Sequence, residues 1–122
     1  AHNRDGVLAL LDAVRTANCT GRRFLLFSAV MDKQYEKMAE MLTDCRLFDG
    51  IYITELKNTR GVSRRLLERA FGAGGPAGSF ADAGQALETI LQSRLPGDRV
   101  YIAGSLYLAG EIKYYIEKSR II

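Results

Sequence analysis

Residues 24–30, Phe-Leu-Leu-Phe-Ser-Ala-Val, decide the fold. The run is apolar at nearly every position, so the strand that it predicts needs cover on both faces. Such a strand is typical of the centre of a parallel sheet with helices on each side. With 122 residues the chain has the length of one domain. We therefore expect a single α/β domain.

The segments around this strand alternate between helix and strand patterns. Helical spacing of apolar residues predicts helices over 5–17, 34–43, a stretch opened by the cap Ser63, 82–93 and 106–118. Apolar runs predict strands over 50–54 and 99–103, with a short edge strand at 79–80 and a flexible glycine-rich connector at 72–78. This order implies right-handed crossovers and a Rossmann-like, mostly parallel sheet with helices on both faces.

Several details of packing also follow from the pattern. The strand over 99–103 is expected to be buried, and Asn3 or Asp5 is expected to cap the first helix. Leu91 is expected to face inward, and Tyr107 and Ile116 are available for packing.

Composition excludes several classes of protein. Hydrophobic residues make up 48% and charged residues 25% of the chain, which excludes long disordered or fibrous structures. The net charge of +3 suits anionic small molecules and nucleic acids alike and decides neither. No apolar run approaches the roughly 20 residues of a membrane span, so no membrane partner is expected. Cys19 and Cys45 lack metal-binding or redox spacing and fit reduced thiols of a cytoplasmic protein.

Ligands of open parallel sheets bind beyond the carboxyl ends of the strands. The segments to inspect are therefore residues 31–33, 55–61 and 104–106. Residues 1–3, Ala-His-Asn, open a helix and look like the same kind of segment with its strand missing. The abrupt start at Ala1 makes us expect a piece of a longer protein.

Residues near predicted helix starts are the candidate ligand contacts. His2 and Asn3 precede a helix, whose free N–H groups attract anions, and both side chains can hydrogen-bond a ligand. Asp32 and Lys33 follow the central strand. The lysine can meet a phosphate or carboxylate, but two solvated charges that open a helix explain this pair as well.

Arg60 and Ser105 are candidates of a different kind. Arg60 follows a strand, where a guanidinium can clamp a carboxylate. Ser105 can cap the last helix and, with free N–H groups, form a small anion site. No histidine or acid stands at the spacing that a hydrolase serine needs.

A basic group surrounds Arg60 and offers an alternative function. Its members are Lys57, Arg60, Arg64, Arg65 and Arg69. The spacing of Arg60–Arg64 and of Arg65–Arg69 predicts that each pair shares a helix side. No aromatic residues are interleaved, so a solvated helix face is favoured over a nucleic-acid patch, and no nucleic-acid partner is expected.

Three of these segments together resemble one family. Residues 1–6 resemble the end of the Asp-Gly-Ala-His-Asn-Pro motif that opens the C-terminal domain of folylpolyglutamate synthase/dihydrofolate synthase. Residues 27–33 resemble its Phe-Gly-Ala-x-x-Asp-Lys segment, and residues 104–108 its Gly-Ser-Leu-Tyr motif. The related Mur ligases share the His-Asn opening and the fold, and residues 57–60 faintly echo their Asp-Asn-Pro-Arg motif. Arg4 departs from the family's proline, and the motif's Asp would precede Ala1.

The resemblance implies a C-terminal domain of the Mur ligase type within an ATP-dependent amide ligase. Such an enzyme adds L-glutamate to dihydropteroate or folates through an acyl phosphate, with ATP and Mg²⁺. The P-loop, the magnesium sites and most of the folate site would lie on an N-terminal ATPase domain. The motif Gly-x-x-x-x-Gly-Lys-Ser/Thr is absent from the chain, so the isolated chain is expected to be inactive, with no metal site and no catalytic residue of its own.

Residue roles carry over from the matching motifs. The resemblance implies that His2 and Ser105 help bind glutamate, and it places His2, Asn3, Asp32 and Lys33 on the nucleotide side. Arg60 as a clamp on a glutamate carboxylate rests on the Mur echo and on its chemistry. Two other readings stay open, namely a domain of another Mur-type or cyanophycin-type ligase and a stand-alone Rossmann-like binding module.

Overall fold

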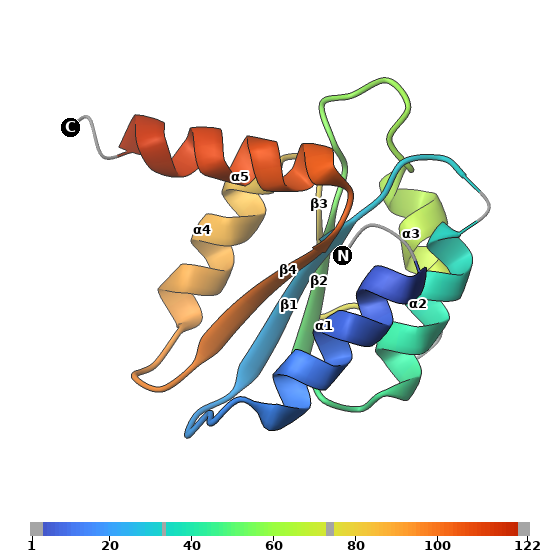
Figure 1. The fold of residues 1–122 in the computed structure, drawn as a ribbon. Coiled ribbons are helices and arrows are strands. Elements are labelled where there is room, and N and C mark those ends of the chain that lie inside the picture. The colour runs from blue at the N-terminus through green and yellow to red at the C-terminus, as the bar shows by residue number, and fades with distance from the viewer. Residues whose placement is uncertain (1–3, 33, 73–74, 120–122) are drawn as a thin grey trace.

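Helices and strands alternate along the whole described chain (Figure 1). The structure, a computed structural model, describes residues 4–32, 34–72 and 75–119. Their order is α1 (Arg4–Thr16), β1 (Arg23–Ser28), α2 (Tyr35–Asp44), β2 (Gly50–Thr54), α3 (Arg64–Phe71), β3 (Gly78–Phe80), α4 (Ala83–Ser93), β4 (Arg99–Gly104) and α5 (Leu106–Ser119). The four strands form one sheet in the order β3-β2-β1-β4, and every neighbouring pair is parallel. The predicted α/β class and parallel sheet are confirmed.

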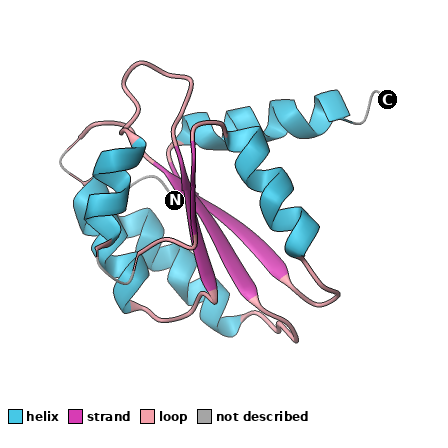
Figure 2. Cartoon of the chain, turned by 180° about the vertical axis from the view of Figure 1, so that it is seen from behind, coloured by secondary structure: helices cyan, strands magenta, loops and turns pink. Residues whose placement is uncertain are grey.

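β1 lies in the interior of the sheet, as its apolar run predicts. Leu25 and Phe27 point into a core that α1, α2 and α3 cover, and both are fully buried. Phe24 and Leu26 point into a second core, covered by α4 and α5. Figure 2 shows the two groups of helices on opposite sides of the strands. The prediction of helices on both faces is therefore confirmed.

The boundaries of β1 and β4 differ from the prediction. β1 ends at Ser28, and Val30 instead forms an isolated antiparallel bridge with Gly61. β4 lies at the edge of the sheet, with β1 as its neighbour on one side. Its first residue is exposed and the next three are only partly buried, so the prediction of a buried strand is wrong for that part. An apolar run does not distinguish an edge strand from a central one.

Leu91, which was expected to face inward, is exposed, and so are Tyr107 and Ile116, which were available for packing. Leu91, Tyr107 and Ile116 are 43%, 51% and 42% exposed. Leu91 lies near the end of α4, and the two others lie on α5. Their neighbours Leu108 and Ile112 provide the buried contacts of α5.

Helix caps follow the sequence closely. The Ser63 hydroxyl accepts the Leu66 N–H at 3.3 Å, and the Asp82 carboxylate accepts the Gln85 N–H at 2.9 Å. Asp5 lies within the first turn of α1 and is not its cap, and Asn3 lies outside the described residues. The predicted edge strand at 79–80 is β3, which begins one residue earlier, at Gly78.

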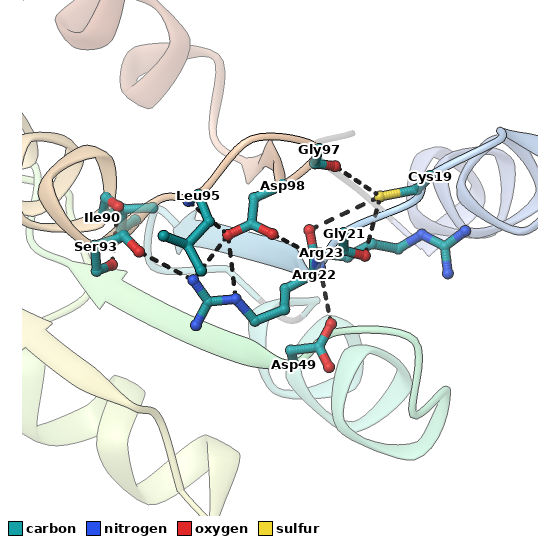
Figure 3. A network of polar contacts seen from close by, with 10 residues as sticks. All are labelled: Cys19, Gly21, Arg22, Arg23, Asp49, Ile90, Ser93, Leu95, Gly97 and Asp98. Atoms are coloured by element: carbon teal, nitrogen blue, oxygen red, sulfur yellow. Dashed lines mark hydrogen bonds and ion pairs between the residues drawn. The ribbon is translucent and has the colours of Figure 1, made fainter.

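A polar network joins the loops at the amino ends of β1 and β4 (Figure 3). The Asp98 carboxylate accepts hydrogen bonds from the Leu95 N–H at 2.9 Å and the Arg22 N–H at 2.7 Å. The Arg22 guanidinium adds two more bonds, at 3.1 and 2.8 Å. The backbone bond from Leu95, followed by the bonds from Arg22, lowers the pKa of Asp98 to about 2.

Candidate functional site

The three segments that follow β1, β2 and β4 are bonded to one another. The Ser105 N–H donates to the Ser28 carbonyl at 2.9 Å, which ties the start of α5 to the end of β1. The Met31 N–H donates to the Arg60 carbonyl at 2.8 Å, which ties the loop after β1 to the loop after β2. The three segments chosen for inspection from the sequence therefore lie together at the carboxyl edge of the sheet.

Gly104 makes this close approach possible. Its φ of +111° lies in the region that favours glycine, and a Cβ at this position would overlap the carbonyl oxygen of Ser28. The same oxygen accepts the Ser105 N–H. The glycine of the Gly-Ser pair therefore sets the position of the serine that follows it.

Ser105 is half-buried at the start of α5. Its hydroxyl accepts the Tyr107 N–H at 3.0 Å, so the predicted helix cap is confirmed. A serine hydroxyl that accepts one bond still has its own proton to donate. Ser105 can therefore cap the helix and bind an acceptor oxygen of a ligand at the same time.

A cavity of about 190 Å³ opens beside Ser105. Gly104, Ser105 and Tyr107 line one side, and Ala29, Val30, Asp32 and Met38 line the rest. Asp32 is exposed, and its carboxylate accepts the Gln34 N–H at 2.7 Å just before α2. The structure thus brings Asp32 and Ser105 to one cavity, whereas His2, Asn3 and Lys33 lie outside the described residues.

Arg60 lies in a tight turn next to this cavity. Its N–H donates to the Asn58 side chain at 2.8 Å, and the Asn58 carbonyl accepts the Gly61 N–H at 3.0 Å. These bonds and the link to Met31 fix its backbone, while the residue as a whole is exposed. Arg60 is not among the residues that line the cavity.

The basic group does not form one helical surface. α3 begins at Arg64, so Arg60 precedes the helix, and the prediction that these two arginines share a helix side is wrong. The Arg64 guanidinium donates to the Ser79 hydroxyl and carbonyl, at 3.0 and 2.8 Å. Arg64 thus ties α3 to β3.

A second cavity, of about 660 Å³, was not foreseen from the sequence. One wall is a face of α5, made of Tyr107, Gly110, Glu111, Tyr114, Tyr115 and Lys118. Residues 57–58, after β2, and the start of α4 form the other wall. The groove-lining residues of α5 recur at helical spacing, which a sequence can show. The opposite wall comes from distant parts of the sequence, which it cannot show.

The described residues contain neither a metal-binding cluster nor a membrane-spanning helix. Within residues 4–32, 34–72 and 75–119, no three His, Cys, Asp or Glu side chains gather in a way that would hold a metal ion. No helix in that part of the chain has the length and apolarity to cross a bilayer.

Comparison with solved structures finds close similarity of fold. E. coli FolC in complex with ADP matches at a TM-score of 0.86 and 21% identity, over 100% of this chain and 28% of that one. The bifunctional folylpolyglutamate synthase/dihydrofolate synthase of Yersinia pestis, complexed with AMPPNP and a Mn ion, matches at 0.84 and 20%, over 96% and 27%. The Mycobacterium tuberculosis folylpolyglutamate synthase with ADP and AMPPCP matches at 0.76 and 21%, over 93% and 28%.

The chain therefore spans a little over a quarter of the length of these enzymes. A search among curated protein sequences finds no match. The profile of one family, described as "Mur ligase, glutamate ligase domain", matches residues 1–106. That match covers most of the chain, which thus belongs to the Mur ligase family as a glutamate ligase domain.

Proposed function

We propose that the chain is the glutamate-side C-terminal domain of an ATP-dependent ligase that joins L-glutamate to dihydropteroate or a folate. The observation that carries this proposal is the cavity at the carboxyl edge of the parallel sheet, which is lined by Ser105, the residue whose hydroxyl caps α5. The family assignment and the Gly-Ser-Leu-Tyr motif at 104–107 support the same function.

The donors at this edge suit a carboxylate ligand. Ser105 offers a hydroxyl at the positive end of α5, where anions are stabilised. Arg60 offers a guanidinium from the neighbouring turn, a group that binds carboxylates in a bidentate manner. We assign these two residues, together with His2, to the carboxylates of the incoming glutamate. Asp32, Lys33, His2 and Asn3 are assigned to the nucleotide side.

The reaction needs groups that this proposal places on another domain of the same enzyme. Hydroxyl, N–H and guanidinium donors suit anions and not a metal ion, so we assign Mg²⁺ and the P-loop to an N-terminal ATPase domain. In such a ligase, ATP converts a substrate carboxylate into an acyl phosphate, from which the amine of glutamate displaces phosphate. The residues of this chain would orient the glutamate amine toward that carbonyl.

The test is a ligation assay on a full-length enzyme that contains this domain. We expect ADP release that depends on glutamate and on dihydropteroate or a reduced folate, and we expect it to fall at least about tenfold in Ser105→Ala. The 122-residue chain alone should release no ADP.

Ser63→Ala is the matched control, because Ser63 caps α3 as Ser105 caps α5 and lies outside the cavity. Equal activity of the two variants would remove Ser105 from the glutamate site. If the enzyme turns over neither dihydropteroate nor the reduced folate, the proposed reaction is rejected.

A further inference from the structure

The larger cavity forms a groove along α5, which we call the α5 groove. Its walls are the face of α5 from Tyr107 to Lys118, residues 57–58 and the start of α4. Tyr107 lines both this groove and the Ser105 cavity. A ligand that occupies the groove can therefore extend toward the proposed glutamate site.

Glu111 marks a place for a hydrogen-bond donor in the groove. Its Oε2 accepts the Lys57 N–H at 2.9 Å. Its Oε1 is buried and has no hydrogen-bond partner within the described part of the chain. A buried acceptor without a donor is costly, so a ligand that brings an N–H to Oε1 gains that free energy on binding.

Two lysines line the groove together with this acceptor. Lys57 Nζ lies 3.8 Å from an Asp82 oxygen, but its side chain is 74% exposed, and so loose an ion pair leaves the ammonium able to bind a second carboxylate. Lys118 Nζ lies 5.9 Å from the centroid of the Tyr114 ring. Lys118 follows Glu111 by two helical turns, which is about 10 Å along the axis of α5.

These groups match a chain that carries amide N–H groups, carboxylates and short methylene stems. We propose that the α5 groove binds the glutamyl tail of the folate substrate or product, an inference that rests on the proposed function. A tail amide donates to Glu111 Oε1, tail carboxylates meet Lys57 and Lys118, and the methylenes pack on the tyrosine rings. A simple cation would leave both lysines unmatched, and a simple anion would leave Oε1 without a donor.

The test is a titration of the ¹⁵N-labelled chain with tri-γ-glutamate, followed by amide chemical shifts. We expect saturable shifts centred on Lys57, Gly110 and Tyr114. L-Glutamate alone is the second probe. Titration of the same amide signals should show that it binds the groove at least about tenfold more weakly than tri-γ-glutamate, because it makes fewer charge-assisted contacts.

Two pairs of variants separate the groove from general attraction. Lys118→Met should lower the affinity for tri-γ-glutamate by about fivefold. Lys113 is an exposed lysine of α5 outside the groove, and Lys113→Met should change that affinity by less than about twofold. Gly110→Phe fills the groove and should abolish the saturable shifts. Ala109→Phe adds the same ring to an exposed position beside it and should keep them.

Several results would overturn the proposal, and they can be distinguished from a failure of the proposed function. The proposal is overturned by an absence of saturable shifts at the groove, by equal weakening in the two lysine variants, or by unchanged binding in Gly110→Phe. Equal affinity for L-glutamate would also overturn it, because the groove would then hold one amino acid and not a tail. A ligase that is active while tri-γ-glutamate fails to bind rejects the tail site alone. Binding without any ligase activity rejects the proposed function instead.

Discussion

Two carboxylates at opposite ends of the sheet have different surroundings. Asp98, at the amino end of β4, is buried and accepts four hydrogen bonds, three of them from Arg22. Glu111, above the carboxyl ends, accepts one from Lys57, and its second oxygen is buried without a partner in the described chain. Figure 3 shows Asp98 with its partners Arg22 and Leu95.

The difference separates a structural end from a binding end. At the amino end, the donors needed by Asp98 come from the protein itself, and the network joins two loops. At the carboxyl end, the backbone is bonded as tightly, but side chains face two cavities. A fixed backbone with open side chains is what a preorganised ligand site requires.

Gly104→Ala should destabilise the fold most, and it tests whether the carboxyl end is rigid. The added Cβ would overlap the Ser28 carbonyl at a φ of +111°, so we expect a loss of about 3 kcal/mol or more in the free energy of unfolding. Urea unfolding followed by circular dichroism measures it. Gly72→Ala is the control for strain alone, because its backbone at φ +77° and ψ −165° also favours glycine but nothing lies within 4 Å of the new Cβ. It should cost about 1–3 kcal/mol, and less than Gly104→Ala. Equal losses would show that backbone strain alone, and not the contact with Ser28, fixes Gly104.

The next effect concerns Asp98 and pH. Its pKa is lowered from a usual value of 3.8 to about 2 in the folded chain, so the carboxylate stabilises the fold above pH 3.8. That contribution is lost as the pH falls toward 2. We expect the urea midpoint of the wild type to fall over this window, and Asp98→Asn to be less stable at neutral pH and to show a smaller fall.

Asp44→Asn is the control for this pH effect, since Asp44 is exposed at the end of α2. It should keep the fall of the urea midpoint that the wild type shows as the pH drops from 3.8 toward 2. An Asp98→Asn curve that coincides with the wild type would contradict the structural role of the amino-end network.

Ser105→Ala and Ser63→Ala distinguish a cap that only stabilises its helix from a cap that also binds a ligand. Each removes a hydroxyl that caps a helix, so each should lower the free energy of unfolding by about 1 kcal/mol. Similar losses of stability with different losses of ligase activity would show that Ser105 has a binding role beyond its cap. A loss in Ser105→Ala several times that in Ser63→Ala would mean that its effect on activity is a folding effect.

The fold was predictable because local patterns agree with the final packing. Residues 24–30 showed the two-sided burial of β1, and Ser63 marked the start of α3. The edge position of β4 was not predictable from its own apolar residues. It depends on the chain crossing from β3, at one edge of the sheet, to the opposite edge beyond β1.

The candidate site was only partly predictable for a related reason. Gly104, Ser105 and Asp32 follow strands, and the rule for carboxyl ends brought them together correctly. The α5 groove depends on the bond between Lys57 and Glu111, which are 54 residues apart. Side-chain pairs at such separations leave no periodic signal in one sequence.

Gly110→Ala gives the smallest effect and tests how open the groove is. Gly110 lies inside α5, and no atom lies within 4 Å of a Cβ built there. Alanine is favoured over glycine in a helix interior by roughly 0.8–1 kcal/mol, so the variant should be more stable by up to that amount, measured by urea unfolding. A loss of stability would mean that the groove is closed by contacts at Gly110 in solution. The carboxyl end would then be filled at Gly110 by the protein's own contacts, as the amino end is at Asp98.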